Sequence, residues 1–429
     1  MLHFKKVNFL FLAIFLFHGL LINAQNKSKN QLQELSKYVG TWYGAENIND
    51  DDLGENPTIK MVVKSTINFV NGLEVTVFEN RNNRWETILV ELISYDTVTN
   101  KIIAKGINEK NECFIGKGNF YENNTWIMKD ENLNGEHIST VNFNFLSNSE
   151  VVLKGTDPSD KELWKIKYIK KNSKDKNIGI QLVSVKDLMN ENPENTLKQL
   201  GRMGYSYIET FVYKEGKFYG YSPEEFRELV EKNGMRFLGS MTFYNPVNKS
   251  DKEIETWWNK TISDHKKAGV AYLSTSNNSL KKVKSLSELK IYTNYYNLVG
   301  KLCKNAGLQF LFHNHKDEFL KVEGKIIYDY FLENTNSKYV SFQSDLYWMD
   351  VAGVNPVDYF KKHPKRFTSW HVKDYKELGQ SGKIDFNKIF LSAEKAGLKY
   401  VISEVEDYNY SPIISVDLAW QYIYYELLK

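Results

Sequence analysis

The hydrophobic period of this chain changes once, and that change constrains the fold more than any other feature of its 429 residues. Before residue 170, apolar and polar residues alternate in short runs such as KMVVKSTINFV and LEVTVFE, separated by Asn-Gly, Asn-Asn and Asp-containing turns. Period-two alternation broken by such turns is typical of antiparallel strands. After residue 176, strand-like segments alternate with helix-like ones. The sequence therefore predicts an all-β half followed by an α/β half.

A charged stretch without apolar residues, KKNSKDK at 170–176, separates the two patterns and is typical of a linker. A chain of this length is also too long for one average domain. We therefore expect an antiparallel all-β barrel or sandwich over 31–171, a linker over 172–176 and a second domain over 177–429.

The β half opens with LSKYVGTWYG, which resembles the Gly-x-Trp start of lipocalin-like barrels, with Gly40 and Trp42 in the matching places. A tryptophan that plugs one end of a β core would account for the same residues. The resemblance implies a lipocalin-like barrel in this half of the chain.

The second half repeats a strand followed by a helix eight times in roughly 250 residues, the usual size of a (β/α)8 or TIM barrel. Ser222 and Pro223 predict a helix start, because serine caps the free backbone N–H groups and proline fits the first turn. Gly307 and Gly397 predict helix ends just before the next strand.

The first 24 residues combine Lys5 and Lys6 with an apolar run that ends in Ile22-Asn23-Ala24, the pattern of a cleaved signal peptide. An uncleaved membrane anchor is the alternative, because the run is near the ~18-residue minimum for a membrane span. No later segment is long and apolar enough for stable membrane insertion. We expect the mature protein to be exported, to the periplasm or the extracellular space.

Cysteine content and net charge exclude two further classes. Cys113 and Cys303, the two cysteines, fall in different predicted domains, so a disulfide framework does not stabilise this fold. A formal net charge of +3, with lysines and acids interspersed, argues against a nucleic-acid partner and favours a small molecule.

In the last third of the chain, four consecutive strand-like segments each carry, at or near the carboxyl end, a residue of a type that binds metal. LQFLFHNHKDEF, YVSFQSDLYW, FTSWHVKD and YVISEVED bring His313, Asp345, His371 and Glu404 to or near the carboxyl ends of their strands. Those ends are where the active sites of TIM barrels lie. Two imidazoles and two carboxylates suit Mn, Zn, Co or Fe better than Mg. His315 is the alternative to His313, because alternation places both on the same face of the strand.

Several stretches of the second half resemble the sugar phosphate isomerase/epimerase family with a xylose isomerase-like TIM barrel: IGIQLVSVKD, FYGYSPEEFRELVEKNGM, HKKAGVAYL, FHNHKDEF, SDLYWMDVAG, WHVKDY and SEVEDY. The resemblance covers nearly all of 177–429. It implies a divalent-cation site in which Asp345, His371 and Glu404 match three of the family's four ligands. The fifth-strand Glu of the family is replaced here by His313, in an HNH motif.

The family resemblance implies that a base removes a proton next to a substrate carbonyl and forms an enediolate. The family often uses metal-bound carboxylates of the fifth and eighth strands as the acid/base pair, which His313 puts in doubt here. The candidates for proton transfer are Glu404, His315, Lys373 and Glu209. Glu209 would equally serve as an ion-pair partner at the barrel rim, whereas Lys373 alternates onto the same side of its strand as His371.

Substrate contacts are expected from Asn314 and from aromatic side chains near the strand ends, Trp348 and Trp370, because sugar rings pack their C–H faces on aromatic rings. The sequence thus predicts a secreted, metal-dependent sugar isomerase, epimerase or lyase that acts on a non-phosphorylated keto-sugar or 3-keto-glycoside. The alternatives are a non-catalytic carbohydrate-binding protein and, against the charge and the export signal, a nucleic-acid phosphodiesterase.

Overall fold

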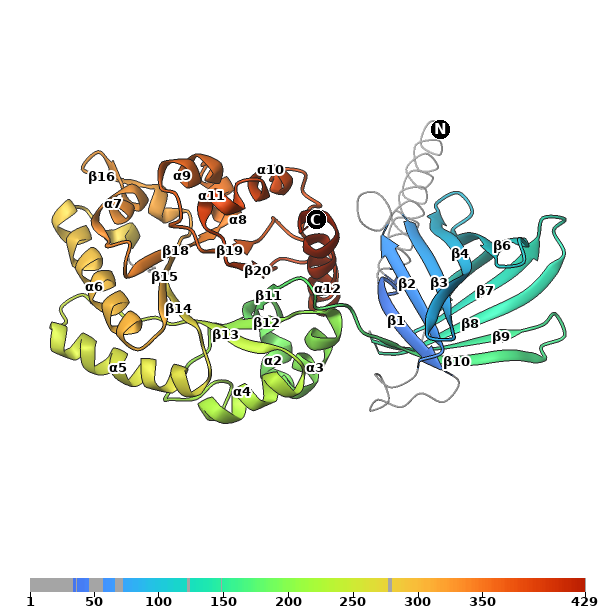
Figure 1. The fold of residues 1–429 in the computed structure, drawn as a ribbon. Coiled ribbons are helices and arrows are strands. Elements are labelled where there is room, and N and C mark those ends of the chain that lie inside the picture. The colour runs from blue at the N-terminus through green and yellow to red at the C-terminus, as the bar shows by residue number, and fades with distance from the viewer. Residues whose placement is uncertain are drawn as a thin grey trace, which may run out of the picture. The chain divides into compact units, whose positions relative to one another are not determined.

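The computed structural model describes residues 34–35, 37–45, 57–65, 72–121, 124–147, 149–276 and 280–428. The predicted signal peptide over 1–24 lies outside these residues. The chain divides into two compact units, of which the first ends at Asn172 and the second begins at Ser173. Each unit contains one closed barrel (Figure 1). No helix in the described part of the chain has the length and apolar character needed to cross a membrane.

The first unit is a closed barrel of ten strands that follow one another around the barrel in chain order. Every neighbouring pair is antiparallel, and pairing of the first strand with the last closes the ring. The strands are β1 (Gly40–Ala45), β2 (Ile59–Ser65), β3 (Gly72–Arg81), β4 (Arg84–Asp96), β5 (Lys101–Asn108), β6 (Cys113–Tyr121), β7 (Thr125–Asn132), β8 (His137–Ser147), β9 (Glu150–Thr156) and β10 (Glu162–Lys170). This arrangement confirms the predicted antiparallel all-β barrel.

The Asn-Asn turns work as the sequence predicts. Asn82 and Asn83 join β3 to β4 with φ angles of 54° and 64°, and two residues of positive φ make the hairpin turn whose twist fits antiparallel strands. The Gly-x-Trp tryptophan, Trp42, is fully buried, and its indole N–H donates to the carbonyl of Tyr38 at 2.7 Å. Trp42 therefore fills core space in the first barrel, and the lipocalin-like resemblance stays a prediction.

The joint between the units is shorter than the expected linker over 172–176. Asn172 belongs to the first unit, since its side-chain oxygen accepts the Thr41 backbone N–H at 2.7 Å. Lys174 already belongs to the second unit, where its ammonium donates to the carbonyl of Gly234 at 2.7 Å. Lys176 likewise donates to the carbonyl of Tyr424.

The second unit is a closed barrel of eight parallel strands, again in chain order, with the helices packed outside it (Figure 1). This confirms the predicted (β/α)8 barrel. The barrel strands are β11 (Ile178–Gln181), β12 (Tyr207–Thr210), β13 (Arg236–Met241), β14 (Tyr272–Thr275), β15 (Gln309–His313), β18 (Val340–Asp345), β19 (Ser369–Val372) and β20 (Tyr400–Ser403). A small hairpin, β16 (Lys321–Val322) and β17 (Lys325–Ile326), interrupts the β15-to-β18 connection.

The helices begin and end where the sequence signals lie. Ser222 caps α4 in a capping box with Glu225, and Pro223 is its first residue. Gly307 and Gly397 take φ angles of 84° and 81° at helix ends. The α-helices of this unit are α2 (Lys186–Glu191), α3 (Pro193–Met203), α4 (Pro223–Lys232), α5 (Asp251–Lys267), α6 (Leu286–Asn305), α7 (Ile327–Asn334), α8 (Leu346–Val351), α9 (Pro356–Lys362), α10 (Phe386–Phe390), α11 (Ala393–Ala396) and α12 (Pro412–Tyr422).

The interior of the second barrel changes from apolar to polar along the strands. Tyr207, Tyr272, Leu311 and Ile402 form an apolar cluster separate from the large core between strands and helices. A Cβ at Gly239 would lie 2.1 Å from the Tyr272 ring, so glycine is needed there to admit the tyrosine. Towards the carboxyl ends of the strands, buried polar side chains take over.

Candidate metal centre and active site

The four side chains expected as metal ligands come from four neighbouring strands. His313 is the last residue of β15 and Asp345 the last residue of β18, where its carboxylate also accepts the Trp348 N–H at 3.0 Å and caps α8. His371 lies in β19, and Glu404 follows β20 directly. Because parallel strands align their carboxyl ends, these four positions share one end of the barrel.

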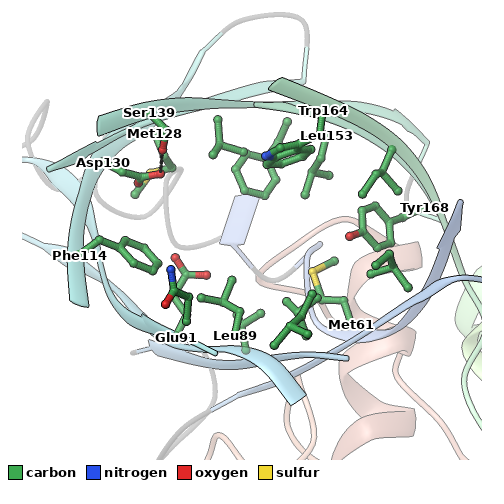
Figure 2. A pocket seen from close by; sticks show the side chains of 18 of the residues that line it. Met61, Leu89, Glu91, Phe114, Met128, Asp130, Ser139, Leu153, Trp164 and Tyr168 are labelled. Carbon is green, nitrogen blue, oxygen red and sulfur yellow. Dashed lines mark hydrogen bonds between the residues drawn. The ribbon is translucent and has the colours of Figure 1, made fainter. Parts of the chain in front are cut away.

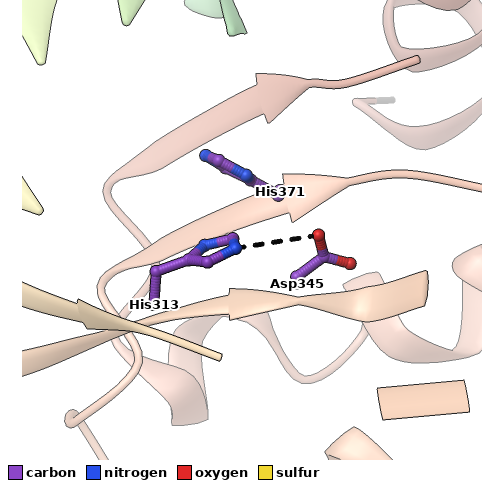
Figure 3. A group of neighbouring side chains, drawn as sticks. All are labelled: His313, Asp345 and His371. Atoms are coloured by element: carbon purple, nitrogen blue, oxygen red, sulfur yellow. Dashed lines mark ion pairs between the residues drawn. The ribbon is translucent and has the colours of Figure 1, made fainter. Parts of the chain in front are cut away.

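Three of the four converge tightly enough to hold one cation. His313, Asp345 and His371 each offer a ligand atom, and these atoms all lie within 4.8 Å of one another. His313 Nε2 is 4.0 Å from Asp345 Oδ2, and the two imidazole rings have centroids 4.7 Å apart (Figure 3). His313 is only 2% exposed, and Asp345 and His371 are fully buried.

Two of these three residues keep a buried polar atom without a hydrogen-bond partner among the described residues. The atoms are His313 Nδ1 and Asp345 Oδ2. Such atoms are rare, because an unsatisfied buried polar group costs about 1–3 kcal/mol. Burial and the nearby His371 and His315 lower the pKa of His313 well below its ordinary value, which keeps its ring neutral as metal binding requires. Burial would lower the pKa of His371, but Glu404 and Glu209 raise it to about 10, so a bound cation would take the place of that proton. With this exchange the donor set fits a divalent cation.

Glu404 adjoins this group but is engaged with two basic partners. Its Oε2 lies 2.6 Å from His371 Nδ1, and its Oε1 accepts from the Lys373 ammonium at 2.9 Å. Burial would raise the pKa of Glu404, but Lys373 and His371 hold it well below the ordinary value. Glu404 is thus an ionised carboxylate one contact away from the three converging residues.

Glu209, a candidate base near the end of β12, pairs with three other side chains. It is fully buried, and its Oε1 lies 2.8 Å from His371 Nε2 and 2.6 Å from the Gln181 amide nitrogen. Its Oε2 accepts from Gln343 at 2.8 Å. Its place behind His371 fits the ion-pair role that the sequence also offered and makes it a positioning residue for that imidazole. A role as the base stays a prediction.

Lys373 is also committed to partners rather than free. Besides Glu404, its ammonium donates to Glu406 at 2.6 Å, and it lies 5.3 Å from the centre of the Trp348 ring. Burial alone would lower the pKa of Lys373, but the surrounding carboxylates, Glu404 first, raise it. The side chain is therefore a charged donor at this end of the barrel and does not fit the role of a base.

His315 is the candidate base that the structure leaves available. It is half-buried, lines a cavity of about 170 Å³ together with His313 and Glu404, and packs edge-on against the His313 ring at 4.9 Å. Burial lowers the pKa of His315 below its ordinary value, so the ring is in its neutral, proton-accepting form near neutral pH. Its ring centroid is 5.7 Å from that of Trp348.

Two of the predicted substrate contacts do not fit their positions. Trp370 is fully buried in the core outside the barrel wall, stacked on Phe360 at 4.9 Å. Asn314 is also fully buried, and it exchanges hydrogen bonds with the backbone of Asp345. Trp348 remains near the site through His315 and Lys373. Asn314 therefore positions the end of β18, where Asp345 lies. Trp370 belongs to the hydrophobic core.

Sequence reasoning missed three polar residues around the site. Glu406 pairs with Lys373, whereas Gln181 and Gln343 hold Glu209. A signal was present for two of them, because Glu406 and Gln343 stand two residues from Glu404 and Asp345 and so alternate onto the same face.

The closed eight-strand barrel and the ligand-type side chains at its carboxyl end define a TIM-barrel protein with a candidate metal centre. A family model of the xylose isomerase-like TIM barrel matches residues 197–424, more than half of the chain, so the chain belongs to that family. The family resemblance in the sequence is thereby confirmed for the second unit.

Two solved structures similar to this chain are both described as sugar phosphate isomerase/epimerases from Parabacteroides distasonis ATCC 8503. One is 25% identical with a TM-score of 0.56, and the match covers 59% of this chain and 96% of the other. The second is 27% identical with a TM-score of 0.55, covering 59% of this chain and 100% of the other. No curated protein matches the chain significantly.

Proposed function

We propose that the second unit is a divalent-metal-dependent sugar isomerase or epimerase that forms an enediolate from a non-phosphorylated keto-sugar or 3-keto-glycoside. The observation that carries this proposal is the convergence of three buried ligand-type side chains, two of them with an unsatisfied polar atom, beside the neutral imidazole of His315. The family membership and the two similar structures support the same class of reaction.

His313, Asp345 and His371 would hold the cation, with Glu404 as a fourth ligand once it leaves His371 Nδ1. The two imidazoles favour Mn, Zn, Co or Fe over Mg. A divalent ion at this place would polarise the substrate carbonyl and acidify the adjacent C–H. Glu209 would fix the orientation of the His371 ring from behind, as carboxylates commonly do for metal-bound histidines.

His315 would remove the proton, because it is neutral, reaches the cavity and is not tied to an acidic partner by a side-chain bond among the described residues. Lys373 would donate a hydrogen bond to the oxygen on which negative charge develops. Reprotonation of the enediolate gives isomerisation or epimerisation. Expulsion of a β-substituent from the same intermediate would give elimination.

A neutral substrate fits the charges around the cavity. Its described lining includes Glu404 and Glu406 and no lysine or arginine, and the nearby Lys373 is balanced by those two carboxylates. The described lining therefore offers a phosphate group no positively charged side chain of its own. The predicted signal over 1–24 adds to this proposal, since an exported enzyme would meet few sugar phosphates.

The test is exchange of solvent deuterium into substrate, measured by mass spectrometry on the metal-loaded full chain. A panel of ketoses and 3-keto-glycosides is compared with the phosphate esters of the same ketoses. We expect deuterium next to the carbonyl of at least one neutral substrate, and loss of that exchange in Lys373→Met and His315→Asn. Absence of exchange with every compound would leave a carbohydrate-binding role, and exchange confined to phosphate esters would contradict the substrate class.

A further inference from the structure

The ten-strand barrel of the first unit encloses a cavity of about 420 Å³, which is within the usual range for small-molecule sites, ~300–1,000 Å³. Barrel diameter grows with strand number, and eight strands already leave room for no more than side chains or one small ligand. Ten strands open a wider interior than their inward side chains fill (Figure 2).

Most of the cavity wall is apolar or aromatic. Trp126 stacks on Phe143 with ring centroids 4.1 Å apart, and Tyr38 packs edge-on against the same indole at 5.3 Å. Aliphatic side chains such as Met61 and Leu153 complete this wall. An apolar molecular body would be desolvated against it at a gain of ~25 cal/mol for each Å² buried.

Two carboxyl groups interrupt this wall on one side of the cavity in the view of Figure 2, Glu91 from β4 and Asp130 from β7. Asp130 is 8% exposed and accepts a hydrogen bond from Ser139 Oγ at 2.8 Å. Glu91 has no hydrogen-bond or ion-pair partner among the residues that the structure describes. It is half-buried and lines the cavity.

Glycines on the two strands between the acids make room for inward side chains: a Cβ at Gly106 would lie 2.3 Å from the Phe114 ring, which lies between the two acids in Figure 2. Glu91 pairs with Gly106 on β5, and Asp130 pairs with Gly116 on β6. A Cβ at Gly116 would lie 2.7 Å from Asp130 Oδ1, so a larger residue there would displace the carboxylate. No lysine, arginine or histidine appears among the described lining residues of the cavity.

This lining selects the charge of an occupant. A buried carboxyl without a partner is unfavourable unless a donor or cation reaches it. An anionic ligand such as a fatty acid would find no counter-charge in the described lining, whereas an ammonium group supplies one to whichever carboxyl is ionised. We propose that the cavity binds a small amphiphilic cation, an organic amine whose ammonium group lies between Glu91 and Asp130 and whose apolar body lies against the aromatic and aliphatic wall.

Matched probes test this on the full chain: decylamine, decanol and decanoate, each below its micelle concentration, titrated by calorimetry at pH 7. Decylamine is protonated there, like a lysine side chain. We expect it to bind at least about tenfold more tightly than decanol, because a hydrogen bond to a charged partner contributes about 1.5–3 kcal/mol. Decanoate should bind most weakly. Equal affinities, tighter binding of decanoate, or no binding of any probe would overturn the proposal.

Variants then locate the site. Glu91→Gln should weaken decylammonium about tenfold or more and leave decanol unchanged, whereas Glu86→Gln, an exposed position on the same strand, should change neither. Unchanged decylammonium binding in Glu91→Gln would also overturn the proposal. If Glu91→Gln does not fold, Asp130→Asn is measured in its place and judged by the same outcomes. Asp345→Ala should bind decylammonium normally, which separates this site from the second barrel.

Discussion

The two barrels of this chain treat buried charge in opposite ways. In the second barrel, Glu209, Glu404, His371 and Lys373 form a chain of contacts in which each acid meets a base within 3 Å. In the first barrel, Glu91 and Asp130 share an apolar cavity whose described lining contains no base. Charged side chains that pair with one another are held in a fixed geometry, as catalysis requires. A carboxyl without a partner in the protein can instead pair with a bound ligand.

The difference follows from strand number and direction. Parallel strands bring residues at their carboxyl ends to one rim, so groups far apart in sequence meet there. An antiparallel ring of ten strands instead encloses a largely apolar internal space, which Glu91 and Asp130 also line. We therefore expect the functional site of the second barrel at the carboxyl ends of its strands. In the first barrel we expect it in the internal cavity.

The largest effect is expected from His315, the proposed base beside the paired charges at the carboxyl end of the second barrel. His315→Asn should lower kcat/KM for deuterium exchange by about 10²-fold or more while metal content is unchanged, because we propose that the imidazole removes the proton without being a ligand. His363→Asn, at the end of α9, is the matched control. Exchange at the wild-type rate in His315→Asn would assign proton removal to another group, Glu404 first.

The next effect concerns Glu209, which lies behind the rim. Glu209→Gln should weaken metal binding by about 10–100-fold, because it removes the carboxylate that orients His371. Metal affinity is measured by competition with a chelator, and Glu228→Gln on the exposed face of α4 is the control. An unchanged metal affinity, with exchange abolished, would instead make Glu209 a base.

A smaller effect should distinguish the first barrel by pH. Burial, with the charge of Asp130 second, raises the pKa of Glu91 from 4.5 to about 8. The folded state therefore holds a proton that the unfolded state releases, so this contribution to stability is present below pH 4.5 and is lost as pH rises to about 8. Asp130, also raised by burial, acts in the same direction, and Tyr38 and Tyr168 titrate above this range.

Calorimetric scans between those pH values should show the thermal transition of the first barrel falling with rising pH, and Glu91→Gln should flatten that dependence. A transition that rises over the same range, or one unaffected by Glu91→Gln, would show that Glu91 has an ionised partner in the folded protein.

The smallest expected effect tests whether the units unfold separately. Ser222→Ala removes the capping box of α4 and should destabilise the second unit by about 1 kcal/mol. Only one of two calorimetric transitions should shift. A shift of both would mean that the two barrels unfold as one cooperative body.

Much of this fold could be predicted from the sequence. Apolar residues recur with a period of two in the first unit, whereas strand-like and helix-like segments alternate in the second. Caps at Ser222 and stops at Gly307 and Gly397 set helix ends locally, so they needed no tertiary information. The places of His313, Asp345, His371 and Glu404 at strand ends could likewise be predicted from the segments that contain them. That these strand ends lie close together follows from closure of the barrel, a property of the whole second unit.

Two errors at the site came from neglecting alternation. Trp370 precedes an inward His371, and Asn314 stands between His313 and His315, so each points away from its neighbours' face. The sequence offered an ion-pair role for Glu209 but could not name the partner, because His371 lies 162 positions away and only the closed barrel brings them together. The cavity of the first barrel was hidden for a similar reason, since it depends on the number of strands that close the ring.

The most direct test of the metal centre is the molar ratio of divalent metal to protein, measured by elemental analysis of the purified full chain and of Asp345→Ala. The matched control is Asp358→Ala, an exposed position on α9. We predict about one ion per chain in the wild type and the control, and almost none in Asp345→Ala, with the thermal transitions retained. Asp345→Ala with a full complement of metal would contradict this account.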